Sequence, residues 1–143
     1  GGVVIIMNPV FEIFHPEYHT AYEKFWNEVL PETTDPFEMQ TNFQEKFARD
    51  PHLIDCYRNR YAHHGFHPFT VWYWATYPLK YLSRVILVGP KSDASAKRLG
   101  VAWAPNLDHA LGQARELTGG DDVVALSIPP FLYMQVDDGK TGV

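Results

Sequence analysis

The sequence has little cysteine, no long apolar run and no excess of basic residues. Its single cysteine, Cys56, cannot form a disulfide within the chain, which fits a reducing, cytoplasmic compartment. We expect an inert, partly buried thiol at Cys56 in preference to a catalytic one. No run reaches the length of about 18 apolar residues, so no membrane-spanning helix is expected. The net charge of −5 argues against a general nucleic-acid-binding surface.

The usual phosphate-binding glycine motifs are also missing. No G-x-G-x-x-G follows the first predicted strand and no G-x-x-x-x-G-K-[ST] occurs, so the usual backbone cradles for dinucleotides and nucleotides are absent. The sequence GPKS at residues 89–92 does lie between a predicted strand and a predicted helix, where an anion can bind. We favour an ordinary connecting loop here, because most such loops bind nothing.

The beginning of the chain has no initiator methionine, no signal peptide and no recognisable tag. A predicted strand starts at residue 3, directly after Gly1 and Gly2. We therefore expect the chain to be part of a longer polypeptide whose earlier elements precede this strand.

What the sequence does contain is an alternation of strands and helices. Val3–Met7 (VVIIM) and Arg84–Val88 (RVILV) are apolar runs typical of strands buried on both faces of a parallel sheet. Residues 101–104 and 123–128 predict two further strands. The alternation predicts an α/β fold, a small parallel Rossmann-like sheet of about three to five strands flanked by helices. So small a sheet indicates an incomplete unit over residues 1–134, followed by a flexible tail at 135–143.

The predicted helices have recognisable start and stop signals. Asp35 and Asp50 each precede a proline, which is the pattern of an N-cap followed by proline at the first helical position. Gly100 and Gly119 predict left-handed C-caps. The helices themselves are expected at residues 17–30, from 36 to about 47, 51–61, 68–79, from about 91 to 99, and 108–117.

Seven histidines raise the question of a metal site. His63, His64 and His67 crowd one predicted turn, and His15 and His19 are four residues apart. Neutral imidazoles can bind zinc or nickel, and a protonated imidazole can orient a substrate carboxylate. No cysteine pair or carboxylate at metal-ligand spacing accompanies them, and a proline separates the earlier pair. We favour turn histidines that are exposed or bonded to the backbone, and metal binding stays the open alternative.

Three consecutive aromatic residues, Trp72, Tyr73 and Trp74, follow the histidine-rich turn. Successive residues of a helix point about 100° apart, so the three side chains cannot all face one core. At least one of them is expected to face solvent, another domain or a ligand.

Taken in order, these segments resemble the C-terminal domain of the lactate racemase family, the nickel-pincer-nucleotide racemases and epimerases. The family's Gly-Gly strand is similar to the opening GGVVIIMNPV, and its Gly/His loop and aromatic helix to HPEYHTAYEKFW. Its D-P-x-E/D segment is similar to residues 34–47. Its next helix and strand look like GFHPFTVWYWATYPLKYLSRVILVGP, and its following turn and helix like AKRLGVAWAPNLDHALGQA. Its final strand looks like DDVVALSIPPF.

The resemblance implies a role for the chain as a lid. In that family the N-terminal domain holds the cofactor, the nickel and the proton-shuttling histidines, and the C-terminal domain closes over the cleft. The resemblance therefore implies that this chain has no catalytic residue, cofactor or metal of its own. Its parent would racemise or epimerise a 2-hydroxy acid or related polyol, and its partners would be the parent's N-terminal domain and that small-molecule substrate.

Five residues are the candidates for the cleft-facing surface of such a lid. They are His63, His64, His67, Trp72 and Trp74. Trp72 stands one residue after the position of a substrate-contacting tryptophan of the family. A different function is also compatible with the residues, namely a non-catalytic Rossmann-like binding or protein-interaction module that uses the same aromatic and histidine patch.

Overall fold

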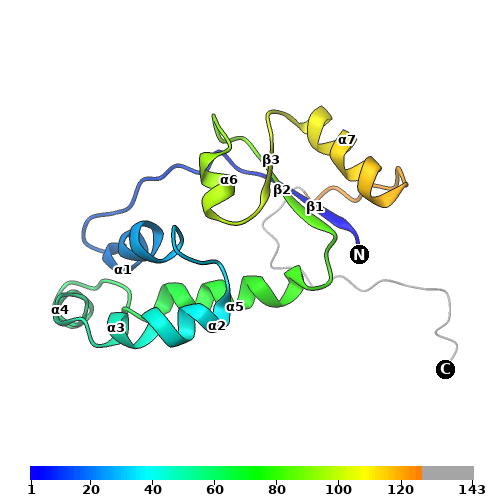
Figure 1. Ribbon diagram of the computed structural model, residues 1–143. Coiled ribbons are helices and arrows are strands. Elements are labelled where there is room, and N and C mark those ends of the chain that lie inside the picture. Colours follow the sequence, from blue (N-terminus) through cyan, green and yellow to red (C-terminus); the bar gives the residue numbers. More distant parts are fainter. Residues whose placement is uncertain (127–143) are drawn as a thin grey trace, which may run out of the picture.

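The computed structural model describes residues 1–126, which form a small sheet and a group of helices beside it (Figure 1). The strands are β1 (Val3–Met7), β2 (Arg84–Val88) and β3 (Ala102–Ala104). They are parallel and lie in the order β1-β2-β3. The predicted class, a small parallel Rossmann-like α/β sheet flanked by helices, is confirmed.

Strands β1 and β2 differ in how deeply they are buried. All residues of β2 after Arg84 are buried, as predicted. The prediction that β1 is buried on both faces is wrong, since Ile6 is 44% and Met7 67% exposed. Within the described residues β1 is an edge strand. Helix α7 (Leu107–Thr118) covers only the face of β1 that carries Val3 and Ile5.

The predicted strand at residues 123–128 is wrong for its described part. Residues 121–126 belong to no strand, and Val123 and Val124 are 67% and 80% exposed. An apolar run becomes a strand only where a neighbouring backbone takes up its hydrogen bonds, and no described strand pairs with this one. Residues 127 and 128, the end of the predicted domain at 134 and the predicted tail at 135–143 lie outside the described residues.

The connections after β2 follow the local signals of the sequence. Helix α6 (Ala94–Arg98) leads to β3, and Asn106 caps α7 by accepting a hydrogen bond from the His109 N–H at 3.0 Å. Gly100 and Gly119 both have φ of +69°, so the predicted left-handed caps are confirmed.

A helical lobe, residues 20–79, is inserted between β1 and β2 (Figure 1). Its helices are α1 (Thr20–Lys24) with the π-helical turn Phe25–Val29, α2 (Pro36–Met39), the π-helical turn Gln40–Gln44, α3 (Glu45–Ala48), α4 (Pro51–Asn59) and α5 (His67–Leu79). The predicted caps are confirmed, because the carboxylates of Asp35 and Asp50 each accept two backbone N–H bonds at the start of α2 and α4. None of the helices within residues 1–126 combines the length and apolar character needed to cross a membrane.

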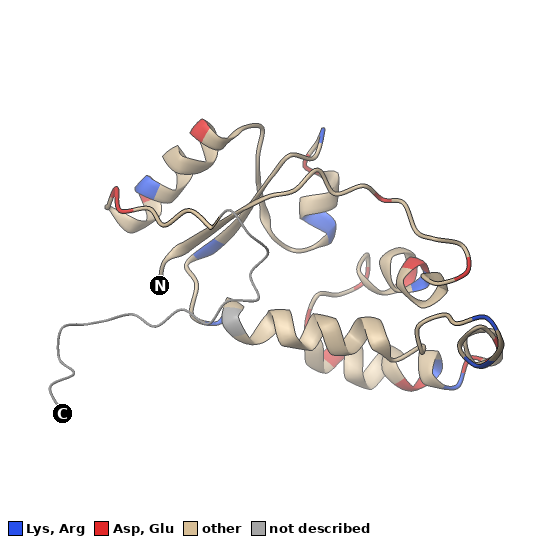
Figure 2. Cartoon of the chain, turned by 180° about the vertical axis from the view of Figure 1, so that it is seen from behind, with Lys and Arg blue, Asp and Glu red and all other residues tan. Residues whose placement is uncertain are grey.

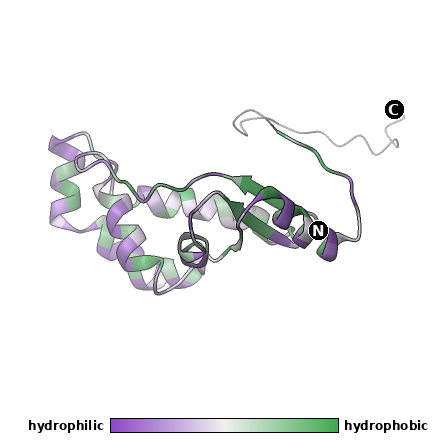
Figure 3. Cartoon of the chain, turned by 90° about the horizontal axis from the view of Figure 1, so that it is seen from above, coloured by the Kyte–Doolittle hydropathy of each residue, from purple (hydrophilic) through white to green (hydrophobic). Residues whose placement is uncertain are grey.

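The lobe and the sheet have separate apolar cores. The core of the lobe centres on Phe69 of α5, which is fully buried and meets the rings of Phe25 and Phe47 edge to face. The core of the sheet lies between β2 and α7, around Ile86 and Ala110. Figure 3 shows the strands almost uniformly hydrophobic, whereas the helices alternate around their axes, as surface helices do.

The turn before α5 depends on a close backbone approach at Gly65. A Cβ atom at Gly65 would overlap the carbonyl oxygen of Phe47 and lie 3.2 Å from the Leu53 side chain. We expect Gly65→Ala to lower the free energy of unfolding by about 1–3 kcal/mol, because the backbone must shift. Gly112→Ala on α7 is the matched control, since nothing lies within 4 Å of its Cβ position. The control should raise stability by about 0.5–1 kcal/mol. Urea unfolding measures both variants, and equal effects would contradict the expectation.

Candidate functional site

Four histidines and one tyrosine from distant parts of the chain meet on the helical lobe. His15 and His19 precede α1, Tyr22 lies within it, His63 follows α4, and His67 begins α5. The ring centroids of His19 and His63 are 5.9 Å apart, and those of His63 and His67 are 4.5 Å apart. We call these five residues the histidine cluster.

Two hydrogen bonds fix the centre of the cluster. The Tyr22 hydroxyl lies 2.6 Å from Nδ1 of His67, and the His63 N–H donates to the backbone carbonyl of Tyr18 at 3.1 Å. The Tyr22 ring also meets the His63 ring edge to face at 5.3 Å. Because Nδ1 of His67 is engaged, Nε2 is the ring nitrogen left for another partner.

The outer part of the cluster is held by bonds between side chains and nearby backbone. Nδ1 of His19 accepts from the His15 N–H at 3.2 Å, and Nδ1 of His15 accepts from the Glu17 N–H at 3.2 Å. These bonds compete with helix formation, so α1 begins at Thr20 and the predicted start at residue 17 is wrong. The His15 ring stacks on Tyr18 with the centroids 4.2 Å apart.

The surroundings of His63 favour its neutral ring. Burial, and secondarily the charge that His67 can carry, lower the pKa of His63 below its ordinary value. Burial raises the pKa of the Tyr22 hydroxyl, which stays neutral. Within residues 1–126 no aspartate or glutamate side chain is bonded to a ring of the cluster, so a proton added there has no anionic partner.

The three histidines of the predicted turn do not converge on one point. His64 faces elsewhere, since its Nδ1 accepts from the Phe66 N–H at 3.1 Å and its ring meets Tyr57 at 5.1 Å. His63 and His67 stack with 29° between their planes, so their ring nitrogens do not aim at a common metal position. In the part of the chain that the structure describes, no three His, Cys, Asp or Glu side chains are placed to hold a metal ion.

The two candidate tryptophans occupy different surroundings. Trp72 packs against the core of the lobe, where its indole N–H donates to the carbonyl oxygen of Thr34 at 3.1 Å. Trp74 is 73% exposed, so the expectation that one of the three consecutive aromatics faces outward is confirmed. With about 100° per residue, Trp74 points within about 20° of His67, whereas Trp72 is turned by about 140°. The structure thus brings His63, His67 and Trp74 to one side of α5 and leaves His64 and Trp72 elsewhere.

An uncharged, largely aromatic surface continues along α5. Trp74, Tyr77 and Tyr81 are each more than 60% exposed, and the rings of the two tyrosines are 5.6 Å apart. We call these three residues the aromatic strip. Figure 2 shows α5 without a single charged residue along its length. Such a patch is typical of a surface that meets another protein or domain.

Three members of the cluster were not among the predicted cleft-facing residues. His15 and His19 were considered only as a pair, and Tyr22 was not a candidate. The spacing of three residues between His19 and Tyr22 is a weak signal that they share a helix face. Their partners His63 and His67 are distant in the sequence. Tyr22 and His67, for example, are 45 residues apart, and no local pattern encodes their hydrogen bond.

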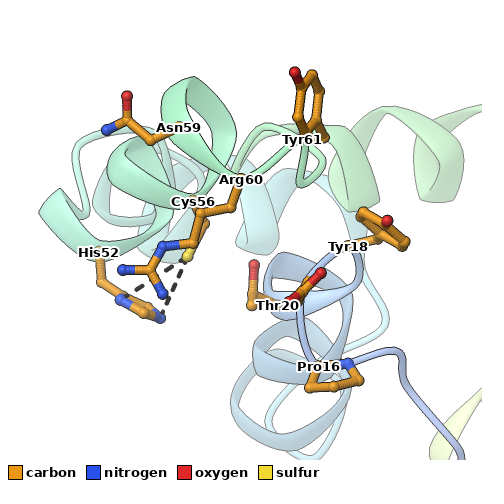
Figure 4. Close-up of a pocket in the computed structure, with 9 residues that line it drawn as sticks. Pro16, Tyr18, Thr20, His52, Cys56, Asn59, Arg60 and Tyr61 are labelled. Atoms are coloured by element: carbon orange, nitrogen blue, oxygen red, sulfur yellow. Dashed lines mark hydrogen bonds between the residues drawn. The ribbon is translucent and has the colours of Figure 1, made fainter.

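Cys56 lies in a different place, beside a cavity of about 310 Å³ between α4 and the turn before α1 (Figure 4). It is 2% exposed, with its sulfur 3.6 Å from Nε2 of His52, so the predicted burial is confirmed. Pro16, Tyr18 and Thr20 come from the segment on the other side of the cavity (Figure 4). This cavity adjoins the histidine cluster, because Tyr18 lines it and stacks on the His15 ring.

The loop at residues 89–92 lines a cavity of about 330 Å³ beside Phe11 and Ile13. It lies where β1 and β2 end, the usual place for ligands in an open parallel sheet. Glu12 is on the same wall and accepts a hydrogen bond from the Ser95 hydroxyl at 2.8 Å. Lys91 lines the same cavity, so its charged lining has both signs and does not single out an anion.

No protein-family model matches this chain, and no curated protein or solved structure gives a significant match.

The hydroxyl of Tyr22 is expected to fix the ring of His67. Tyr22→Phe should free that ring and lower the free energy of unfolding by about 0.5–1.5 kcal/mol through loss of one hydrogen bond. Long-range ¹H–¹⁵N spectra of the imidazoles should show His67 losing its single tautomer. Tyr57→Phe is the control, because the 51% exposed Tyr57 makes only a ring contact with His64. An unchanged His67 spectrum in Tyr22→Phe would show that the bond does not hold the ring.

The lowered pKa of His63 predicts the sign of a pH effect. Its folded pKa lies below the ordinary value of 6.5, so the unfolded chain binds more protons in this range. The stabilisation that comes from the neutral His63 ring is therefore present above pH 6.5. It is lost as the pH falls from that value through the lower pKa of the folded state. His63→Gln should reduce the loss between about pH 7.5 and 5.5, measured by urea unfolding at each pH. His109→Gln on α7 leaves His63 intact and should keep the wild-type loss. A larger loss of stability in His63→Gln than in the wild type would contradict a lowered pKa of His63.

Proposed function

We propose that this chain is the substrate-side lid domain of a lactate-racemase-like isomerase. The resemblance of its segments to that family, taken in order, supports the proposal, as does the small parallel α/β sheet. The observation that carries it is that His63, His67 and Trp74 lie on one side of α5, with His67 at its start and Trp74 near its middle. In the resembling family the start of this helix carries a substrate-contacting tryptophan, at the position that Val71 occupies here, one residue before Trp72.

The proposal assigns the nickel-pincer nucleotide to another domain. The described residues do not fit a nickel site, because the stacked rings of His63 and His67 do not direct their nitrogens to one point. The lid supplies positioning and exclusion of water. Nε2 of His67 is the group that can donate a hydrogen bond to a polar substrate or accept one, since Tyr22 engages Nδ1.

The aromatic strip supplies the other part of the lid's role. Trp74, Tyr77 and Tyr81 are exposed and follow His67 along α5 and just beyond its end. Closure of this strip against the N-terminal domain of the parent would remove apolar surface from water and seal the cleft. The parent enzyme would then racemise or epimerise a 2-hydroxy acid or related polyol within that closed cleft.

One observation favours a second function, a non-catalytic binding or protein-interaction module. The same aromatic strip is a suitable contact surface for a separate protein, because exposed tryptophan and tyrosine are enriched at interfaces. In that case the histidine cluster would contribute to recognition, and the polypeptide would have no racemase activity.

Kinetics of the full-length polypeptide distinguish these functions. We expect Trp74→Ala and His67→Ala to lower kcat/KM for racemisation by on the order of 10- to 100-fold, because substrate positioning is lost. His109→Ala on α7 is the control and should leave kcat/KM unchanged. The 143-residue chain alone should be inactive.

Three results would contradict the lid. Racemase activity of the 143-residue chain alone would place the machinery within it. No racemase activity in the full-length polypeptide would favour the interaction module. Stoichiometric, EDTA-sensitive binding of Ni²⁺ or Zn²⁺ in calorimetry, abolished by His63→Ala and His67→Ala, would indicate an intrinsic metal module.

A further inference from the structure

Three rings of the histidine cluster, those of His19, His63 and His67, are stacked, and this arrangement suits a different ligand from a metal. His63 lies between His19 and His67, with 15° and 29° between the ring planes. In such a stack the N–H groups lie in the ring planes and emerge side by side at the ring edges. A metal needs lone pairs that converge on one point, whereas an oxyanion accepts hydrogen bonds on several oxygens from donors that are spread apart.

We propose that the histidine cluster is a proton-linked oxyanion site, which takes up a proton as it binds a carboxylate, phosphate or similar group. The proposal rests on the proposed function for its setting, because closure of the lid would carry this site to the cleft. Its physical basis is the cluster itself, so it can be tested without a partner domain.

The charge environment of the cluster makes the site depend on protonation. The groups that face the His63 and His67 rings are Tyr22 from α1 and His19 from the turn before it, with His15 behind. Within residues 1–126 no lysine, arginine, aspartate or glutamate forms a hydrogen bond or ion pair with these rings. Among the described residues no cation is bonded to these rings, so the positive charge on the rings themselves depends on protonation of an imidazole.

Without a bound anion, a proton on one imidazole of the cluster disfavours a proton on its neighbour. Burial disfavours a proton on His63, and a proton on His67, whose ring centroid is 4.5 Å away, disfavours it further. An oxyanion at the ring edges offsets this repulsion and raises the affinity of both rings for protons. By linkage, the anion must then bind more tightly as the pH falls.

Tyr22 has a positioning role in this site. Its hydroxyl engages Nδ1 of His67 at 2.6 Å and so leaves Nε2 as the nitrogen that meets the anion. His64 gives the matched comparison, since its Nδ1 is bonded to the Phe66 N–H and its ring packs on Tyr57. The two histidines are three residues apart, yet only His67 belongs to the stack.

The test is a histidine titration of the 143-residue chain by NMR, in sodium acetate, in sodium sulfate and in sodium chloride at equal ionic strength. Acetate probes a carboxylate and sulfate a tetrahedral oxyanion, and neither changes its protonation appreciably between pH 6 and 8. We expect acetate or sulfate, but not chloride, to raise the pKa of His63 and His67. Above the ring pKa the affinity should fall about tenfold per pH unit for one linked proton. Calorimetry in two buffers of different ionisation enthalpy should show uptake of about one proton per anion.

Variants separate the site from general attraction to a protonated surface. His63→Gln and His67→Gln should each weaken anion binding at least tenfold at pH 6, whereas His64→Gln should leave it unchanged. Tyr22→Phe keeps every histidine and should weaken binding several-fold, which provides a test if a histidine variant does not fold. An effect of acetate alone assigns a carboxylate ligand, and an effect of sulfate alone assigns a phosphate-like one.

Several outcomes would overturn the proposal. They are the absence of any pKa change with either oxyanion, an equal effect of chloride, pH-independent binding, or equal loss in His64→Gln. The lid is judged separately, by racemase turnover of the full-length polypeptide. Proton-linked anion binding without turnover would leave the oxyanion site in place and reject the lid, and turnover without anion binding would do the reverse.

Discussion

The ring of Phe69 is the contact on which the functional surface of this protein depends. It is fully buried, and the rings of Phe25 and Phe47 stand edge-on to it at centroid distances of 4.9 and 5.1 Å. Through these contacts α5 is packed against the π-helical turn Phe25–Val29 and α3. Because His67 lies two residues before Phe69, the packing that fixes the core also brings His67 to the Tyr22 hydroxyl. The position of His67 in the histidine cluster thus depends on an apolar contact in the core of the lobe.

The geometry of the cluster decides which chemistry its histidines can support. Imidazoles are the commonest metal ligands in proteins, and three of them close together in sequence suggest metal binding. Here the His63 and His67 rings lie face to face at 4.5 Å, and His64 is bonded to the backbone elsewhere. Face-to-face imidazoles compete for protons and present N–H groups at their edges. This arrangement favours hydrogen bonding to an anion over coordination of a cation.

Those features that arise from neighbouring residues were predictable. The first two strands and the helix caps at Asp35 and Asp50 depend on side-chain type and short-range bonds, and the structure agrees with each. The burial of β1 was not predictable, because it depends on which elements cover the two faces of the sheet. Residues 123–126 match the pattern of a strand, yet they form none without a pairing backbone. His19 and Tyr22 were missed for the same reason, since their partners His63 and His67 are distant in the sequence.

The sequence by itself determined the α/β class, the parallel strands and the outward direction of one residue among Trp72, Tyr73 and Trp74. These follow from apolar periodicity and from the fixed rotation per residue of a helix. Only the tertiary structure decided that His63 and His67 stack on each other, that Tyr22 engages His67 and that His64 is excluded. Hydrophobic patterns specify which faces are buried, but contacts across helices depend on how those buried faces pack together. The candidate site is made of such contacts.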